Sequence, residues 1–104
     1  FGKATVDVAA PGGSLSNGGL LSTGIPYCGG PCSSGDQSYV TSSGTSMATP
    51  VVSGLAALIK SAAPHLNHKS IKNIIEKHGK SITELKNFIK SGQVINVGQS
   101  LSSI

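Results

Sequence analysis

The stretch Gly44-Thr45-Ser46-Met47-Ala48-Thr49-Pro50 decides the fold of this chain, because it joins two halves of unlike composition. Before it, residues 1–45 are rich in Gly, Ser, Thr and Pro, interrupted by short β-prone runs. After it, residues 46–104 carry apolar side chains at helical spacing. The sequence therefore predicts a strand-and-loop part over 1–45 and a helical part over 46–104.

The quoted stretch also places a hydroxyl at the start of a helix. Apolar residues from Ser46 to Ala62 cover most of a helix circumference, a pattern typical of a buried helix. Pro50 is tolerable only near the first turn, and Pro64 marks the end. A hydroxyl at Ser46 lies beside unpaired N–H groups and the positive end of the helix dipole, which suit a developing oxyanion. The alternative is that Ser46 only caps the helix, as Ser often does.

Shorter signals predict the remaining elements. Three short strands or extended pieces are predicted at Thr5–Ala10, Gly18–Thr23 and Ser38–Thr41. Three further helices are predicted: one capped by Asn67 and closed by Gly79, one from Thr83 to Gly92, and a short one capped by Asn96 through Leu101. The segment Gly24–Asp36 is predicted to be a surface loop.

Three segments of the chain resemble the subtilase family of serine proteases. The string G-T-S-M-A-T-P at Gly44–Pro50, followed by V-x-G, resembles the nucleophile signature of that family. Val6–Gly12 resembles its V-x-V-x-A-P-G strand and turn, and Gly92–Val97 is similar to its closing G-x-V-N-A element. The three segments follow one another in family order and together span almost the whole chain. The resemblance implies the C-terminal part of a subtilase catalytic domain.

This resemblance implies a fold and a set of site residues. The fold would be α/β: the C-terminal portion of the subtilisin-like three-layer fold with a parallel sheet, a core strand at Val6–Gly12 and a central buried helix after Ser46. Ser46 would be the acylated nucleophile, with its own backbone N–H as one oxyanion donor and Thr45 as a weaker helper. Many relatives have His after the Pro of the motif, whereas this chain has Val51. The other motif residues are Gly44, Met47, Ala48, Thr49 and Pro50.

The partners that would activate the serine are not found before it in the sequence. A serine hydroxyl is a weak nucleophile without an adjacent base and an orienting carboxylate. In subtilases the order along the chain is Asp, His, Ser, but His65, His68 and His78 all follow Ser46. A helix from Ser46 to Ala62 would be about 24 Å long, well beyond a hydrogen-bond reach of roughly 3 Å. We therefore expect His65 and His68 to be exposed loop and helix residues.

The acidic residues do not complete the site either. The chain contains Asp7, Asp36, Glu76 and Glu84, and Asp7 belongs to the strand element instead of a catalytic acid motif. We therefore expect a piece of a serine endopeptidase that is inactive alone and needs the upstream part of its catalytic domain as a partner. The alternative is a piece of a catalytically dead homologue that acts as a binding protein. The family implies protein or peptide substrates and the secretory pathway or the cell exterior.

The two cysteines lie four residues apart, at Cys28 and Cys32. A zinc site would need two further ligands, and no Cys or His lies nearby to supply them. A disulfide closing this tight turn would contribute about 2 kcal/mol in the loop-entropy model. We favour the disulfide over two free thiols, and it would indicate an oxidising compartment.

Charge and hydropathy exclude other functions. The net charge is +4, with no Arg and seven of the eight Lys in the second half. These lysines lie between apolar residues at helical spacing, which indicates the solvated faces of helices. Because Arg and aromatic residues are scarce, nucleic acid is not an expected partner. No apolar run reaches the 18 or so residues of a membrane span. No metal site or other cofactor site is visible, although calcium could bind elsewhere in a full-length protein.

Overall fold

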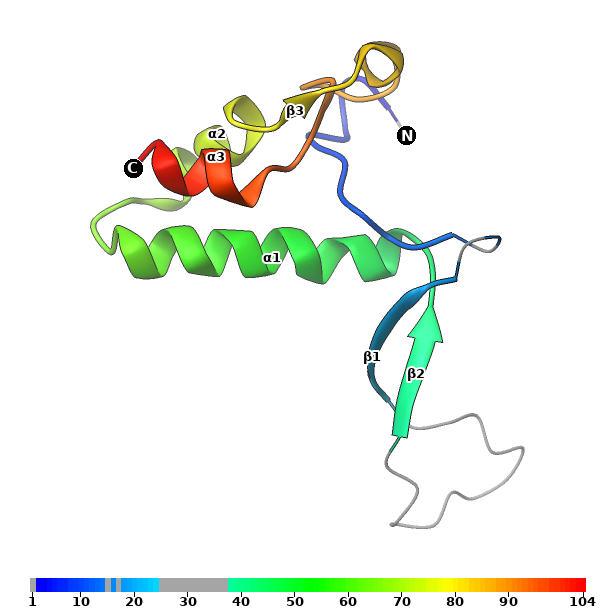
Figure 1. The fold of residues 1–104 in the computed structure, drawn as a ribbon. Coiled ribbons are helices and arrows are strands. Elements are labelled where there is room, and N and C mark those ends of the chain that lie inside the picture. Colours follow the sequence, from blue (N-terminus) through cyan, green and yellow to red (C-terminus); the bar gives the residue numbers. More distant parts are fainter. Residues whose placement is uncertain (1, 15, 17, 25–37) are drawn as a thin grey trace. The chain divides into compact units, whose positions relative to one another are not determined.

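The computed structural model describes residues 2–14, 16, 18–24 and 38–104. Helices and short strands are combined in these residues (Figure 1), and this confirms the predicted α/β class. They form two compact units, one of Phe1–Ala10 with Thr49–Ile104 and the other of Pro11–Ala48. Cys28, Cys32 and Asp36, with all of the predicted surface loop except Gly24, lie outside the described residues.

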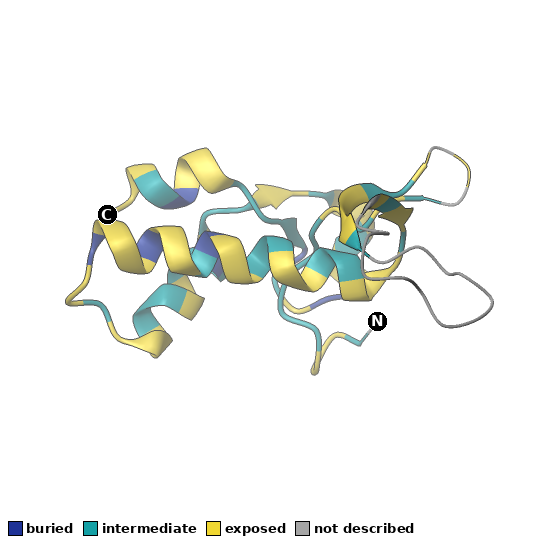
Figure 2. Cartoon of the chain, turned by 90° about the horizontal axis from the view of Figure 1, so that it is seen from below, coloured by how far each residue is buried: buried dark blue, intermediate teal, exposed yellow. Residues whose placement is uncertain are grey.

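The helix α1 (Thr45–Ala62) confirms the main prediction from the sequence. It begins one residue before Ser46 and ends two residues before Pro64. It is not buried on all sides, however. Leu55 and Ile59 are 2% and 0% exposed, whereas Leu58 is 51% exposed. Figure 2 shows this alternation of buried and exposed residues along the helix. The expected fully buried helix is therefore covered on one side only by the described residues.

The hydrophobic core lies where α1 meets the helix α2 (His68–Lys77). Its buried members are Leu55, Ile59 and Ile75. The partly buried apolar residues packed around them are Val8, Val52, Ala56, Leu66, Ile71, Ile74, Ile95 and Leu101. The last of these belongs to the short helix α3 (Val97–Ser102). Burial of these apolar side chains away from water is the main favourable contribution to the folding free energy of this unit.

Two asparagines begin α2 and α3, as the sequence predicts. The side chain of Asn67 accepts a hydrogen bond from the N–H of Ser70 at 3.0 Å. The side chain of Asn96 accepts one from the N–H of Gln99, also at 3.0 Å. Each bond satisfies one of the N–H groups that the first turn of a helix leaves without an internal partner.

The predicted end of α2 is displaced by one residue. The cap is His78, whose N–H donates to the Ile74 carbonyl at 3.0 Å, and not Gly79. Gly79 lacks the positive φ of a glycine cap. Glycine is required at this position because the backbone of Val94 approaches closely. A Cβ at residue 79 would lie 2.6 Å from the Val94 carbonyl oxygen.

The predicted helix from Thr83 to Gly92 is wrong in type and length. A 3₁₀ helix, η1 (Thr83–Asn87), takes its place. The chain then leaves the helical path, because the N–H of Lys90 donates to the Val6 carbonyl at 2.8 Å. Gly92 has φ +64°, a left-handed conformation that favours glycine. Contacts with the start of the chain therefore override the local helical preference.

The strand predicted at Thr5–Ala10 is also wrong, since Ala9 alone forms a bridge, parallel to Val94. The N–H of Ala9 donates to the Gln93 carbonyl at 3.0 Å, and the Ala9 carbonyl accepts from Ile95 at 2.9 Å. The strand β4 (Gln93–Val94) is only two residues long, so a ladder cannot continue beside it. Its other partner is β3 (Lys80–Ser81), which pairs with it antiparallel.

The unit Pro11–Ala48 contains a hairpin of β1 (Leu20–Gly24) and β2 (Ser38–Ser42). The two strands are antiparallel, with Leu20 opposite Ser42 and Gly24 opposite Ser38. Both extended pieces predicted here, Gly18–Thr23 and Ser38–Thr41, are thus confirmed to within one or two residues at their ends. β2 leads through Ser43 and Gly44 directly into α1, whose first turns contain the rest of the motif (Figure 1).

Candidate active site

Ser46 is an exposed residue in the first turn of α1. The two N–H groups that follow it, from Met47 and Ala48, donate to the Gly44 carbonyl at 3.0 and 3.3 Å. The N–H and hydroxyl of Ser46 itself have no hydrogen-bond partner in the described part of the chain. A free hydroxyl and a free N–H on one residue are the two groups that an acyl-transfer site needs for attack and for oxyanion binding.

Gly44 forms the turn between β2 and α1. Its φ is +138°, a backbone conformation that residues with a side chain rarely adopt. Its N–H donates to the Gly12 carbonyl at 2.7 Å. Gly12 approaches so closely that a Cβ there would lie 2.6 Å from the Gly44 oxygen and 3.4 Å from the Ala48 Cβ. This pair of glycines fixes the loop that presents Ser46.

The Gly12 contact was not foreseen from the sequence. The segment Pro11-Gly12-Gly13 reads as a turn, and its similarity to a family motif gives no indication of what it touches. Its glycine content was the only signal, because glycine occurs where backbone segments approach closely. A second close approach in the same unit joins Gly19 to the backbone of Ser42, at the base of the hairpin.

The other motif residues form the first turns of α1. Pro50 lies inside the helix and has no N–H. The Ser46 carbonyl therefore lacks the helical hydrogen bond that the N–H of residue 50 would otherwise donate to it. Thr45 is an exposed residue at the helix start. The Thr49 carbonyl accepts a hydrogen bond from the Ser53 hydroxyl at 3.2 Å. The roles of Ser46 as nucleophile and Thr45 as oxyanion helper remain predictions at this stage.

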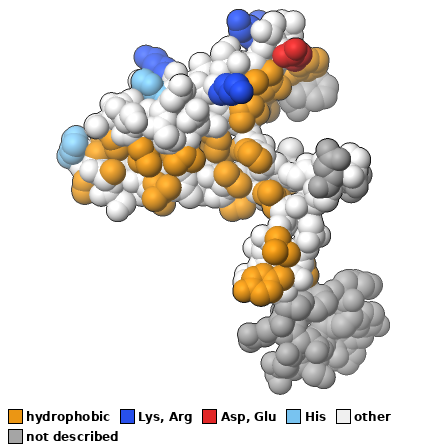
Figure 3. Space-filling model, viewed as in Figure 1, with side chains coloured by type: hydrophobic (Ala, Val, Ile, Leu, Met, Phe, Trp, Pro, Cys, Tyr) orange, Lys and Arg blue, Asp and Glu red, His pale blue; other side chains and the backbone are white. Residues whose placement is uncertain are grey.

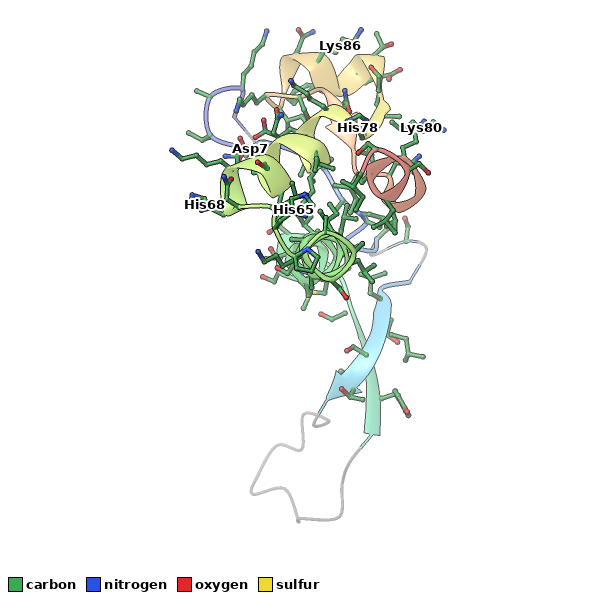
Figure 4. The ribbon with its side chains drawn as sticks, turned by 90° about the vertical axis from the view of Figure 1, so that its left-hand side faces the viewer. Asp7, His65, His68, His78, Lys80 and Lys86 are labelled. Carbon is green, nitrogen blue, oxygen red and sulfur yellow. The ribbon has the colours of Figure 1, made fainter. Side chains whose placement is uncertain are left out.

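No general base accompanies Ser46 within its own unit, as far as that unit is described. Residues 11–14, 16, 18–24 and 38–48 contain no His, Asp or Glu. The three histidines belong to the other unit: His65 follows α1, His68 begins α2 and His78 caps it (Figure 4). His65 and His68 are exposed, as expected.

Two carboxylates of the larger unit, those of Asp7 and Glu76, are engaged in ion pairs. The Lys72 Nζ lies 2.9 Å from Asp7 Oδ2 and 3.6 Å from Glu76 Oε1. The Lys90 Nζ lies 3.5 Å from Asp7 Oδ1 and 3.3 Å from Glu76 Oε2. The hydrogen bond from Lys72 holds the pKa of Asp7 below its ordinary value, and the same bond raises the pKa of Lys72. These groups tie the start of the chain to α2 and act structurally.

A groove of about 370 Å³ lies beside this ion-pair cluster, within the larger unit. The residues that line it are Asp7, Val8, Val52, Ala56, His68, Ile71, Lys72, Ile75 and Glu76. No Ser, Thr or Cys is among the described residues that line it. These residues therefore offer no hydroxyl or thiol nucleophile, and we do not assign acyl-transfer chemistry to the groove.

Metal sites and membrane-spanning helices are absent from the part of the chain that the structure describes. That part holds no group of three or more His, Cys, Asp or Glu side chains placed to bind a metal ion. It also holds no helix that is long and apolar enough to cross a membrane.

The fold and the site together define an α/β chain that presents a serine hydroxyl and its own N–H at the start of a helix. The model of the subtilase family matches residues 1–92, and the chain belongs to that family. The segments Val6–Gly12 and Gly44–Pro50 lie within this match, which confirms their resemblance to the family, whereas Gly92–Val97 extends beyond it.

Individual relatives agree with this assignment. The chain is 36% identical over 76 residues to serine protease AprX of Bacillus subtilis, covering 73% of this chain and 17% of that protein. It is 44% identical over 59 residues to an extracellular protease of Xanthomonas campestris, covering 57% of this chain and 9% of that protein. A solved protease of Pseudoalteromonas arctica superposes with a TM-score of 0.74 at 34% identity, covering 93% of this chain and 29% of that one. The chain thus spans less than a fifth of the length of the Bacillus and Xanthomonas relatives.

Proposed function

We propose that the protein carrying this chain is a serine endopeptidase that hydrolyses peptide bonds through an acyl-enzyme on Ser46. The observation that carries the proposal is the pairing of a free hydroxyl with a free N–H on an exposed residue of the first turn of α1. Membership of the subtilase family supports it, because the relatives named above are proteases. The substrate class is therefore protein or peptide.

The proposed reaction proceeds in two steps. The Ser46 Oγ loses its proton to a base, bonds to the carbonyl carbon of the substrate, and the carbonyl oxygen becomes an oxyanion that accepts from the Ser46 N–H. The C–N bond then breaks, the leaving amine takes the proton, and an ester to Ser46 remains. Water attacks the ester in the second step, releases the acid and returns the proton to Ser46. Thr45 would assist the oxyanion.

The base and its orienting acid would come from residues outside the described part of the Ser46 unit. The family order of Asp, His, Ser would put them upstream of this chain, and that upstream part of the catalytic domain would be its partner. We accordingly propose that the chain is inactive alone. Secretion or an extracellular location is proposed from the name of the Xanthomonas relative. Calcium in a complete domain stays a prediction, and nucleic acid is not a proposed partner.

One alternative function is supported by the absence of a base among the described neighbours of Ser46. A catalytically dead homologue would keep the scaffold and act as a binding protein. Reactivity separates the two, because a fluorophosphonate probe reacts with an activated serine and leaves an inactive one unmodified.

The test is labelling with a fluorophosphonate probe, located by mass spectrometry of the peptide that contains Ser46. It is applied to this chain and to a protein extended upstream to a complete subtilase domain. Labelling of the extended form only, abolished by Ser46→Ala, is the expected result. Labelling of neither form would refute peptidase activity and favour the binding protein, whereas labelling of the short chain would refute its inactivity. Ser43→Ala, on a half-buried serine of the same loop, is the control that should still label.

A further inference from the structure

We propose that the face of the β1–β2 hairpin that carries Leu21 and Tyr39 binds an extended, uncharged segment of the polypeptide substrate. This segment would lie at a distance from the peptide bond that is cut. The inference rests on the proposed function, and it makes Tyr39 and Leu21 specificity-determining residues. Its starting point is an exposed apolar pair on a sheet, in the same unit as Ser46.

The register of the hairpin places these two side chains on one face. Leu21 lies opposite Thr41, and Tyr39 lies opposite Thr23. Residues that face each other across an antiparallel pair point to the same side, so these four share a face. Leu21 and Tyr39 are diagonal neighbours on it, about 7–8 Å apart, a separation that an aromatic ring can bridge.

The apolar side chains of this face are exposed, whereas those of the other face are half-buried. Leu21 is 69% exposed and Tyr39 is 73% exposed. On the other side, Leu20 and Val40 are half-buried, and Val40 packs closely over Gly24. Figure 3 shows apolar side chains at the surface of the hairpin. Large apolar side chains held open on a small sheet indicate a binding surface more often than scattered single ones do.

The chemistry of the hairpin selects the kind of partner. Neither strand carries a charged residue, so the face offers no ion pair to a charged segment. A tyrosine ring favours aromatic and aliphatic side chains. The hairpin is a two-stranded sheet, so each strand has an outer edge without a strand partner among the described residues, and such edges bind extended peptides. The fitting partner is an extended peptide with an aromatic or branched aliphatic side chain.

The occupant is identified as the substrate because the hairpin is continuous with the serine loop. β2 leads through Gly44 to Ser46 within one unit, and the Gly44–Gly12 hydrogen bond of 2.7 Å holds that loop. Tyr39 lies three residues before the end of β2, or about 10 Å along the strand. A peptide whose reacting bond lies at Ser46 therefore meets Tyr39 at least about three residues from that bond.

The test uses the protein with its complete catalytic domain and two kinds of substrate. The first is a short peptide p-nitroanilide, which reaches Ser46 but not the hairpin. The second is a set of long, internally quenched peptides that are identical around the cleaved bond. Each long peptide carries either Phe or Gly at one position beyond the third, on either side of that bond.

We expect wild type to prefer Phe over Gly by about three- to tenfold in kcat/KM at one of these positions. Tyr39→Ala and Leu21→Ala should bring this ratio close to one while leaving turnover of the nitroanilide unchanged. Tyr39→Phe should keep the preference, because the ring is retained. Ser22→Ala is the matched control, since Ser22 is an exposed residue on the other face of the same strand.

Two results would overturn the proposal. In the first, wild type shows no Phe preference, or neither alanine variant changes it. In the second, both variants lower the melting temperature and slow long and short substrates alike, which would mean that another part of the domain covers this face. If Tyr39→Ala does not fold, Leu21→Ala decides between these outcomes. Failure of the proposed function is distinguishable, because wild type would then hydrolyse neither substrate and Ser46 would not label.

Discussion

Gly12→Ala tests how the loop before Ser46 is held, without altering the motif itself. A Cβ at residue 12 would lie 2.6 Å from the Gly44 carbonyl oxygen. Carbon and oxygen atoms in contact are ordinarily about 3.3 Å apart, so one side must move by about 0.7 Å. The same oxygen accepts from the N–H groups of Met47 and Ala48, so its displacement shifts the first turn of α1. A misplacement of about 1 Å can cost a factor of about 100 in rate, and we therefore expect a loss of about tenfold or more at Ser46.

The assay is the rate of fluorophosphonate labelling at Ser46 in the complete catalytic domain, with a thermal melt of each variant. Gly98→Ala is the matched control, because its Cβ would meet only the Asn96 Oδ1, at an ordinary 3.6 Å. It lies in α3 and should leave the labelling rate unchanged. A wild-type labelling rate in Gly12→Ala would refute the reasoning, since the loop would then accept a methyl group without moving the serine.

Three further predictions concern stability. Ile59→Ala should lower the free energy of unfolding by about 2–5 kcal/mol in urea titrations, because Ile59 is fully buried in the core; a loss well below this range would contradict the described packing. Ser100→Ala should raise it by about 1 kcal/mol, because the buried Ser100 hydroxyl has no hydrogen-bond partner among the described residues; a decrease would reveal a partner. Asp7→Asn should lower the melting temperature by a few degrees at pH 7 and have no effect near about pH 2. The lowered pKa of Asp7 means that its ionised form stabilises the fold above the unfolded pKa of about 3.9, and that this contribution is lost as pH falls through the folded pKa. Equal effects at both pH values would indicate that its charge is unimportant.

Elements set by local signals could be predicted from the sequence. Asn67 and Asn96 each begin a helix because a side-chain oxygen accepts from an N–H three residues on, which depends only on neighbouring residues. The span of α1 was likewise predicted from its apolar residues and from Pro64. At the candidate site, the sequence identified Ser46 and Gly44 from the motif alone.

Elements that depend on distant partners could not be predicted. The helix expected from Thr83 is shortened because Lys90 and Ser91 donate their N–H groups to Val6 and Asp7, far away in the sequence. The strand expected at the start of the chain is reduced to one bridge for a related reason, the brevity of β4. The Gly12–Gly44 contact belongs to the same class, because no pattern near either glycine indicates its partner.

The single charge of α1 has a consequence for handling the protein. Lys60 is the only charged residue of that helix, and its Nζ donates to the carbonyls of Pro64 at 2.6 Å and Leu66 at 2.8 Å. It therefore closes the end of the helix, and the exposed side around Leu58 has no charge of its own. Self-association through that side would be driven by apolar contact, and ammonium sulfate should strengthen it instead of screening it. Purification would accordingly favour low salt, the opposite of the choice for a basic protein that sticks to nucleic acid.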